Sequence, residues 1–149
     1  MNNTKTILTS LVIVIANNIV GHFFAPNGIT FTPIVLILIS VLIGLLNTEL
    51  TSIWKSILLA GLIGLHDIGI KLYSGGSHDN EGLGWVHGFL FIGLIPAYGI
   101  LIGGIFKTKS ESILKKIIAI ILFPLIIWIH LELFSGLGLG RHYWYNWNG

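Results

Sequence analysis

The sequence contains no cysteine, and few of its 149 residues are charged. The absence of cysteine excludes disulfide bonds, thiolate metal ligands and cysteine nucleophiles, so any bound metal must be held by nitrogen and oxygen atoms. Several catalytic signatures are also missing: the chain has no phosphate loop, no G-x-S-x-G elbow, and neither the H-E-x-x-H nor the H-x-x-H-H histidine motif. Whether the protein is an enzyme is therefore left open.

The shortage of charge indicates a membrane protein. Charged residues make up 9% of the chain, against roughly 25% in soluble domains. Hydrophobic residues make up 54%, and the mean hydropathy is +0.88. The net charge of +2 is too small and too dispersed for nucleic-acid binding. We expect a single integral membrane domain over residues 1–149, in contact with lipid.

Five apolar segments have the length expected of a membrane-spanning helix, about 17–25 residues. The first could be mistaken for a signal peptide, but Asn17, Asn18 and His22 follow its apolar run, and no clear small-x-small cleavage site is present. The sequence therefore predicts an all-α, polytopic membrane helix bundle with about five transmembrane helices and an aromatic C-terminal tail at 136–149. The predicted spans are 7–24, 30–47, 53–73, 83–106 and 113–135.

Basic residues predict the orientation of this bundle, because they are retained on the cytoplasmic side. With the N-terminus inside, only Lys71 and Arg141 lie at the outer side, and six lysines lie at the inner side: Lys5, Lys55, Lys107, Lys109, Lys115 and Lys116. We therefore expect the bundle to have its N-terminus inside and its C-terminus outside (N-in/C-out), and we expect its location to be a bacterial inner (plasma) membrane.

All six histidines then fall at or near the outer ends of the spans: His22, His66, His78, His87, His130 and His142. Histidine and carboxylate side chains are the usual components of metal sites and proton relays. Asp67 is the strongest single candidate, because a charge inside a span must be paired or hydrated. Lys71 lies four residues further on the same helical face, so an intrahelical ion pair is the alternative reading of both residues. His66 lies about 100° around the helix from Asp67, so the two side chains point to different spots.

Other polar residues at this end complete the predicted pocket. Asn18 and His22 share one face of the first span, where an interhelical hydrogen-bond patch is the alternative. His130 and Glu132 point to nearly opposite sides of the last span. The polar loop at 74–82 contains His78, Asp79 and Glu81, which are predicted to bind a hard cation, to cap the next helix, or simply to form a solvated turn. The tail is predicted either to cover the pocket as a lid or to lie among lipid headgroups.

Small residues predict the packing faces of the helices, since they allow close approach in lipid. The third span carries Ser56, Ala60 and Gly64 at four-residue spacing, continued by Asp67 and Lys71. The fourth span carries Gly93, Ala97 and Gly104. Both faces should point inward or toward a partner.

Three hypotheses follow for the function. The first is an outer-face site that binds a transition metal (Zn, Cu or Fe) or haem, as in a membrane metalloenzyme or redox subunit. Its cofactor ligands would be His66, His87 and His130, with His22 and Asp67 as further metal ligands. The second is a proton or ion pathway, although the cytoplasmic half lacks matching polar residues. The third is an assembly subunit of a larger membrane complex, or a homo-oligomer.

Overall fold

The computed structural model of the protein describes residues 2–47, 49–108 and 111–140, and these residues form helices without any strand. In chain order the elements are α1 (Asn3–Phe23), α2 (Asn27–Thr30), α3 (Thr32–Ser40), the π-helix η1 (Val41–Leu46), α4 (Ser52–Tyr73), α5 (Asn80–Lys107) and α6 (Ile113–Phe134). The all-α prediction is confirmed. Four helices, α1, α4, α5 and α6, are long and apolar enough to cross a membrane.

The predicted second span, 30–47, is divided among three elements. A short helix, α2, comes first, and α3 continues directly into η1 to give one apolar segment, Thr32–Leu46. At about 1.5 Å per residue this segment is about 22 Å long, which is less than the roughly 30 Å of a bilayer's hydrocarbon core. The segment is thus shorter than the four long helices, and a fifth complete span stays a prediction.

Helix boundaries follow polar caps rather than the edges of the apolar runs. The side chain of Asp79 accepts a hydrogen bond from the backbone N–H of Gly82, so α5 begins at Asn80 rather than at the predicted residue 83. Asn2 and Thr51 cap α1 and α4 in the same way. A side-chain oxygen satisfies an N–H at the helix start, and this extends each helix into the polar sequence before the apolar run.

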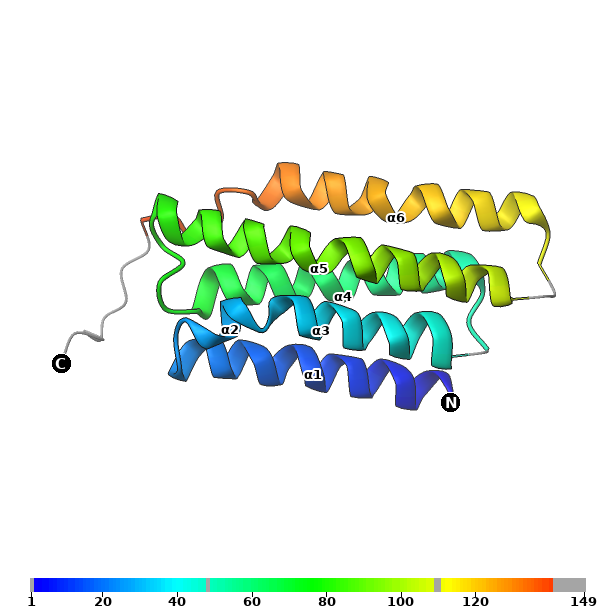
Figure 1. Cartoon of the computed structure of the whole chain (residues 1–149), viewed down its shortest axis with the longest axis horizontal. Helices are drawn as coiled ribbons and strands as arrows, with labels where there is room; N and C mark the ends of the chain where they lie inside the picture. The colour runs from blue at the N-terminus through cyan, green and yellow to red at the C-terminus, as the bar shows by residue number, and fades with distance from the viewer. Residues whose placement is uncertain (1, 48, 109–110, 141–149) are drawn as a thin grey trace.

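The helices lie side by side and alternate in direction (Figure 1). Helix α4 is central: it packs most extensively against α6 and also against α1. The α3–η1 segment packs against α5, whereas α5 and α6 make few contacts with each other. One end of the bundle holds the ends of α1, α4 and α6 and the start of α5; we call it the histidine end.

Small residues bring these helices close together, as the sequence predicts. All five predicted inward-facing residues of α4 are buried: Ser56, Ala60, Gly64, Asp67 and Lys71. On α5, a Cβ atom at Gly104 would overlap the backbone of Gly44 in η1. Large apolar side chains instead cover the outside, where Ile95 is 77% exposed and Leu133 is 70% exposed. This apolar exterior suits a lipid environment.

Candidate functional site

Five of the six histidines lie toward the histidine end of the bundle. His22 is near the end of α1, His66 is on the last third of α4, His78 is in the loop that follows, His87 is on the first turns of α5, and His130 is near the end of α6. His142 and the rest of the tail from residue 141, including the predicted lid, lie outside the described residues. For the five described histidines, clustering toward one end is confirmed.

At the centre of this end lies a buried cluster formed by Asp67, Lys71 and His130, which we call the Asp67 cluster. The Lys71 ammonium donates to Oδ2 of Asp67 at 2.7 Å, and Nε2 of His130 lies 2.8 Å from the same oxygen. The side chains of Asp67 and Lys71 are fully buried, and that of His130 is 11% exposed. The predicted intrahelical ion pair is therefore present, and His130 joins it from α6.

The lysine also links the two helices that carry the cluster. Lys71 Nζ donates a second hydrogen bond, of 3.0 Å, to the backbone carbonyl of Phe134 at the end of α6. A buried charge needs both a counterion and hydrogen-bond partners to offset its loss of hydration. Asp67 supplies the counterion and Phe134 an additional acceptor, which holds the end of α6 against α4.

The approach of His130 to Asp67 depends on Gly64. A Cβ atom at residue 64 would lie only 3.1 Å from Nδ1 of His130, so the imidazole packs directly over the glycine. Glycine at this position of α4 therefore provides the space in which the α6 imidazole reaches the carboxylate three residues further along.

The second oxygen of Asp67 is the unusual atom of the cluster. Its Oδ1 is buried and has no hydrogen-bond partner among the residues that the structure describes. Both donors, Lys71 and His130, instead share Oδ2. A buried carboxylate oxygen without a donor is unfavourable by roughly 1–3 kcal/mol or more, so Oδ1 is an open acceptor inside the bundle.

His66 points away from Asp67, as the helical geometry predicts. Its Nε2 lies 3.1 Å from the hydroxyl of Thr32 at the start of α3. Because that hydroxyl donates to the carbonyl of Gly28, its oxygen accepts from the Nε2–H of His66. This assigns the lone pair of the neutral ring to Nδ1, which is buried and also lacks a partner within the described part of the chain.

His87 approaches the cluster from α5. It is half-buried, and its Nε2 is enclosed without a hydrogen-bond partner in residues 2–47, 49–108 and 111–140. Lys71 and Asp67 lie close enough to act on it electrostatically. Within the described residues, the histidine end thus contains four buried polar atoms without a hydrogen-bond partner: Oδ1 of Asp67, Nδ1 of His66, Nε2 of His87 and Oδ1 of Asn18.

The loop between α4 and α5 serves mainly structural roles. Asp79 caps α5 through Gly82, so the predicted capping role is present. Nδ1 of His78 lies 3.0 Å from the carbonyl of Gly138, and the N–H of Gly140 donates to the carbonyl of His78. These bonds tie the loop to the turn that follows α6.

The remaining predicted pocket residues lie around the cluster. Nδ1 of His22 lies 3.0 Å from the carbonyl of Tyr73, which joins the ends of α1 and α4. Asn18 packs against Gly69, where a Cβ atom would overlap its amide. Glu81 and Glu132 are exposed, so Glu132 and His130 do point to different sides of α6.

The histidines and carboxylates of this end are not gathered into a metal-ligand set. Among the described residues, no three His, Asp or Glu side chains lie together in a way that could hold a metal ion. The nearest approach is the pair of Asp67 and His130, and there the Lys71 ammonium occupies the position at which a cation would be bound.

The sequence predicts that the cytoplasmic half lacks polar residues matching those of the histidine end, but the opposite half does contain buried polar groups of other kinds. Lys55 is buried there and donates to the carbonyl of Gly44 in η1 at 3.0 Å, and Ser56 donates to the carbonyl of Ala119 at 2.8 Å. Further buried polar side chains lie near them: Thr6, Ser10, Ser40, Asn47 and Ser52. Ser56 lies on the predicted inward face of α4, whereas the burial of Lys55 and of the isolated polar residues on α1 and α3 depends on packing that the sequence does not show.

No protein-family model, curated protein sequence or solved structure matches this chain. The chemistry of the site therefore rests on its own residues.

Proposed function

We propose that the Asp67 cluster is a proton-exchange site in the outer half of a multi-pass membrane protein, and that the chain contributes to a proton pathway. One observation carries the proposal: Lys71 and His130 share a single oxygen of buried Asp67, while the other oxygen remains an open acceptor. Intramembrane Asp, His and Lys in contact with one another are typical of proton relays.

The geometry suggests His130 as the entry point, because it is the one member of the cluster whose side chain is not fully buried. Its imidazole takes a proton at Nδ1 and releases the Nε2 proton to Oδ2 of Asp67 across the 2.8 Å hydrogen bond. The protonated carboxyl is neutral, and its attraction for Lys71 falls. Asp67 is the charged group in contact with His130, and Lys71 binds the same carboxylate oxygen; His87 on α5 lies within electrostatic range of both α4 residues, and Glu132 on α6 is exposed.

We further propose five spans with the N-terminus inside and the histidine end outside, in a bacterial inner (plasma) membrane. The burial of Lys71 supports this orientation, because a lysine paired within a helix does not act as an exposed loop charge. The orientation would open His130 toward the outer compartment.

A complete pathway needs a partner. Between Ser56 and Asp67, the buried residues of α4 include Leu59, Leu62 and Ile63, which cannot carry a proton. On α4, these apolar side chains therefore separate the polar residues of the opposite end from the Asp67 cluster. A second membrane subunit, or another copy of this chain, would supply the connection, which agrees with the assembly-subunit hypothesis.

The test is infrared difference spectroscopy of the full chain in lipid nanodiscs during pH jumps between about pH 5 and 8, the range in which imidazoles change charge. We expect a carboxyl band that disappears in Asp67→Asn and changes its pH dependence in His130→Gln. Glu132→Gln, two residues from His130 but exposed, is the matched control and should leave that band unchanged. A spectrum in which Asp67→Asn removes no pH-dependent band would show that Asp67 is only structural.

A second pair of variants tests whether the position of the His130 imidazole matters. Gly64→Ala places a methyl group against His130 and should shift the pH dependence of the Asp67 band, because the imidazole must move. Gly61→Ala, one turn away on α4, has no described atom within 4 Å of its new Cβ and should not shift that dependence. Equal effects of the two alanines would contradict the proposed entry through His130.

A bound transition metal or haem is the second candidate. The open nitrogen atoms of His66 and His87 favour it, since each has the chemistry of a neutral ligand. Metal analysis and a visible absorption spectrum of protein purified without a His tag would test it. Stoichiometric metal, or a haem band, that is lost in both His66→Ala and His87→Ala would assign the cofactor. Retention in both variants would exclude these two ligands.

A further inference from the structure

Lysines gather where α5 ends and α6 begins, at the end of the bundle opposite the histidine end (Figure 1). Lys107 is the last residue of α5 and Lys115 lies in the first turn of α6, and both are exposed. Lys116 is only 9% exposed, and its Nζ donates a long hydrogen bond, of 3.5 Å, to the carbonyl of Phe106. That bond places the Lys116 ammonium beside the end of α5. We call Lys107, Lys115 and Lys116 the basic patch.

The positive charge of the basic patch is not balanced by the residues that the structure describes. Within these residues, the only ion pairs join Asp67 to Lys71 and to His130. Glu111 is the one acidic residue between positions 100 and 120, and both of its oxygens accept from the backbone N–H of Ser52, at 3.2 and 3.1 Å, at the start of α4. The first turn of α6 has no acidic residue, although the partial positive charge of a helix start disfavours lysines there. The patch therefore suits an anionic partner.

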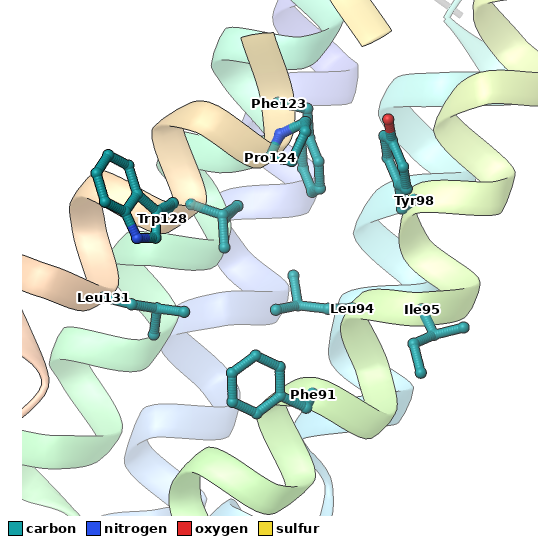
Figure 2. Close-up of a pocket in the computed structure, with 9 residues that line it drawn as sticks. Phe91, Leu94, Ile95, Tyr98, Phe123, Pro124, Trp128 and Leu131 are labelled. Atoms are coloured by element: carbon teal, nitrogen blue, oxygen red, sulfur yellow. The ribbon is translucent and has the colours of Figure 1, made fainter. Parts of the chain in front are cut away.

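The surface next to the basic patch is apolar, which indicates the kind of anion that fits. Phe106, Ile113 and Leu114 adjoin the lysines in sequence, and each is more than half exposed. Further along the same two helices, apolar and aromatic side chains such as Phe91 and Leu131 line a groove of about 470 Å³ (Figure 2). The outside of α5 and α6 thus changes from cationic to apolar along the helix axis, as a phospholipid changes from headgroup to acyl chain. A soluble anion or an acidic protein segment would match only the lysines.

We propose that the basic patch binds the headgroup of an anionic phospholipid, whose acyl chains lie along the outside of α5 and α6. The lysine ammonium groups supply the attraction, since basic residues next to a membrane-spanning helix favour anionic lipids. A zwitterionic phospholipid has the same acyl chains but no net charge, so it binds more weakly. This inference goes beyond proton exchange, and it holds whichever compartment this end of the bundle faces.

The experiment measures binding of a fluorescent phosphatidylglycerol to the full chain in nonionic detergent micelles, through energy transfer from the tryptophans. Phosphatidylcholine with the same fluorescent group is the zwitterionic reference. We expect tighter binding of phosphatidylglycerol, with competition by unlabelled phosphatidylglycerol but not by an equal concentration of inorganic phosphate. Equal binding of the two lipids would overturn the proposal. Competition by inorganic phosphate would overturn it as well, because the patch would then be a site for a soluble anion.

Matched lysine variants test whether the basic patch is the site. Lys107→Gln and Lys115→Gln should each weaken phosphatidylglycerol binding about fivefold, the effect of about one basic residue at an anionic surface, and should leave phosphatidylcholine binding unchanged. Lys5→Gln makes the same change of charge at the same end, but on α1, which packs mainly against α4 and α3, so it should have no effect.

The three substituted lysines are exposed, so the variants should fold. An equal loss of binding in Lys5→Gln would show that the lipid responds to the net charge of the protein, which would overturn the proposed site. Unchanged phosphatidylglycerol binding in both Lys107→Gln and Lys115→Gln would overturn it too.

Discussion

At the scale of single residues, Asp67 organises the histidine end. One of its oxygens holds Lys71 of the same helix at 2.7 Å and His130 at 2.8 Å, and the bond to His130 connects α4 with α6. Both partners of the ion pair are fully buried. Losing either partner leaves the other charge without compensation in apolar surroundings, so the two residues should depend on each other for stability.

This dependence can be measured with a double-mutant cycle. We expect Asp67→Asn alone to lower the free energy of unfolding by about 3–5 kcal/mol, because Lys71 is left charged and buried. Lys71→Met alone should be destabilising for the converse reason. The double variant removes both charges, so its loss of unfolding free energy should be clearly smaller than the sum of the two single losses. Reversible unfolding in mixed detergent micelles measures all four proteins; strictly additive losses would contradict the coupling.

The sequence predicts the Asp67–Lys71 pair but not its third member. The pair lies four residues apart on one helix, and helical geometry alone brings the two side chains together. The contact between His130 and Asp67 joins residues 63 positions apart and depends on the packing of α6 against α4. For the same reason, the sequence favours His66, His87 and His130 as ligands, with His22 and Asp67 next, although only packing decides which of these side chains meet.

At the scale of the helices, close backbone approach holds the bundle together. Gly104 of α5 lies against Gly44 of η1, and Gly93 lies against Pro33 and Leu36 of α3. In lipid, such contacts replace the hydrophobic driving force that associates helices in water. The helices therefore associate through van der Waals contact at their glycines.

Adjacent glycines of α5 offer a direct test of this packing. Gly104→Ala would place a methyl group into the backbone of η1 and should lower the free energy of unfolding by about 1–3 kcal/mol. Gly103→Ala has open space around its new Cβ and should instead stabilise α5 by up to about 1 kcal/mol, because alanine is the better helix former. Unfolding in mixed micelles distinguishes them, and equal effects would argue against the α5–η1 contact.

The helices were largely predictable because their apolar runs are long, but the second span was not. Its sequence shows a continuous apolar run, whereas the structure contains α2, α3 and a π-helix. Gly44 lies in the last turn of the π-helix, and its carbonyl accepts from Lys55, a residue of another helix. Its local sequence, Val41–Leu46, contains no signal for that irregularity, which depends on a tertiary contact.

At the scale of the whole molecule, the orientation decides which compartment reaches His130. Because the chain has no cysteine, single cysteines can report it without removing any native residue of that type. In intact cells, a membrane-impermeant thiol reagent should label Glu81→Cys, at the start of α5, and should not label Ser112→Cys, just before α6. Both positions are exposed. The reverse pattern would place the histidine end in the cytoplasm.

The location of both ion-pair partners on α4 also bears on how the protein is made. Helices enter the membrane in chain order, and α6 is the last of them to be synthesised. Lys71 does not have to wait for α6, because its counterion lies one turn before it on the same helix. During biogenesis, the outer half of α4 can therefore partition into lipid with its two charges already paired, and the later arrival of His130 completes the site.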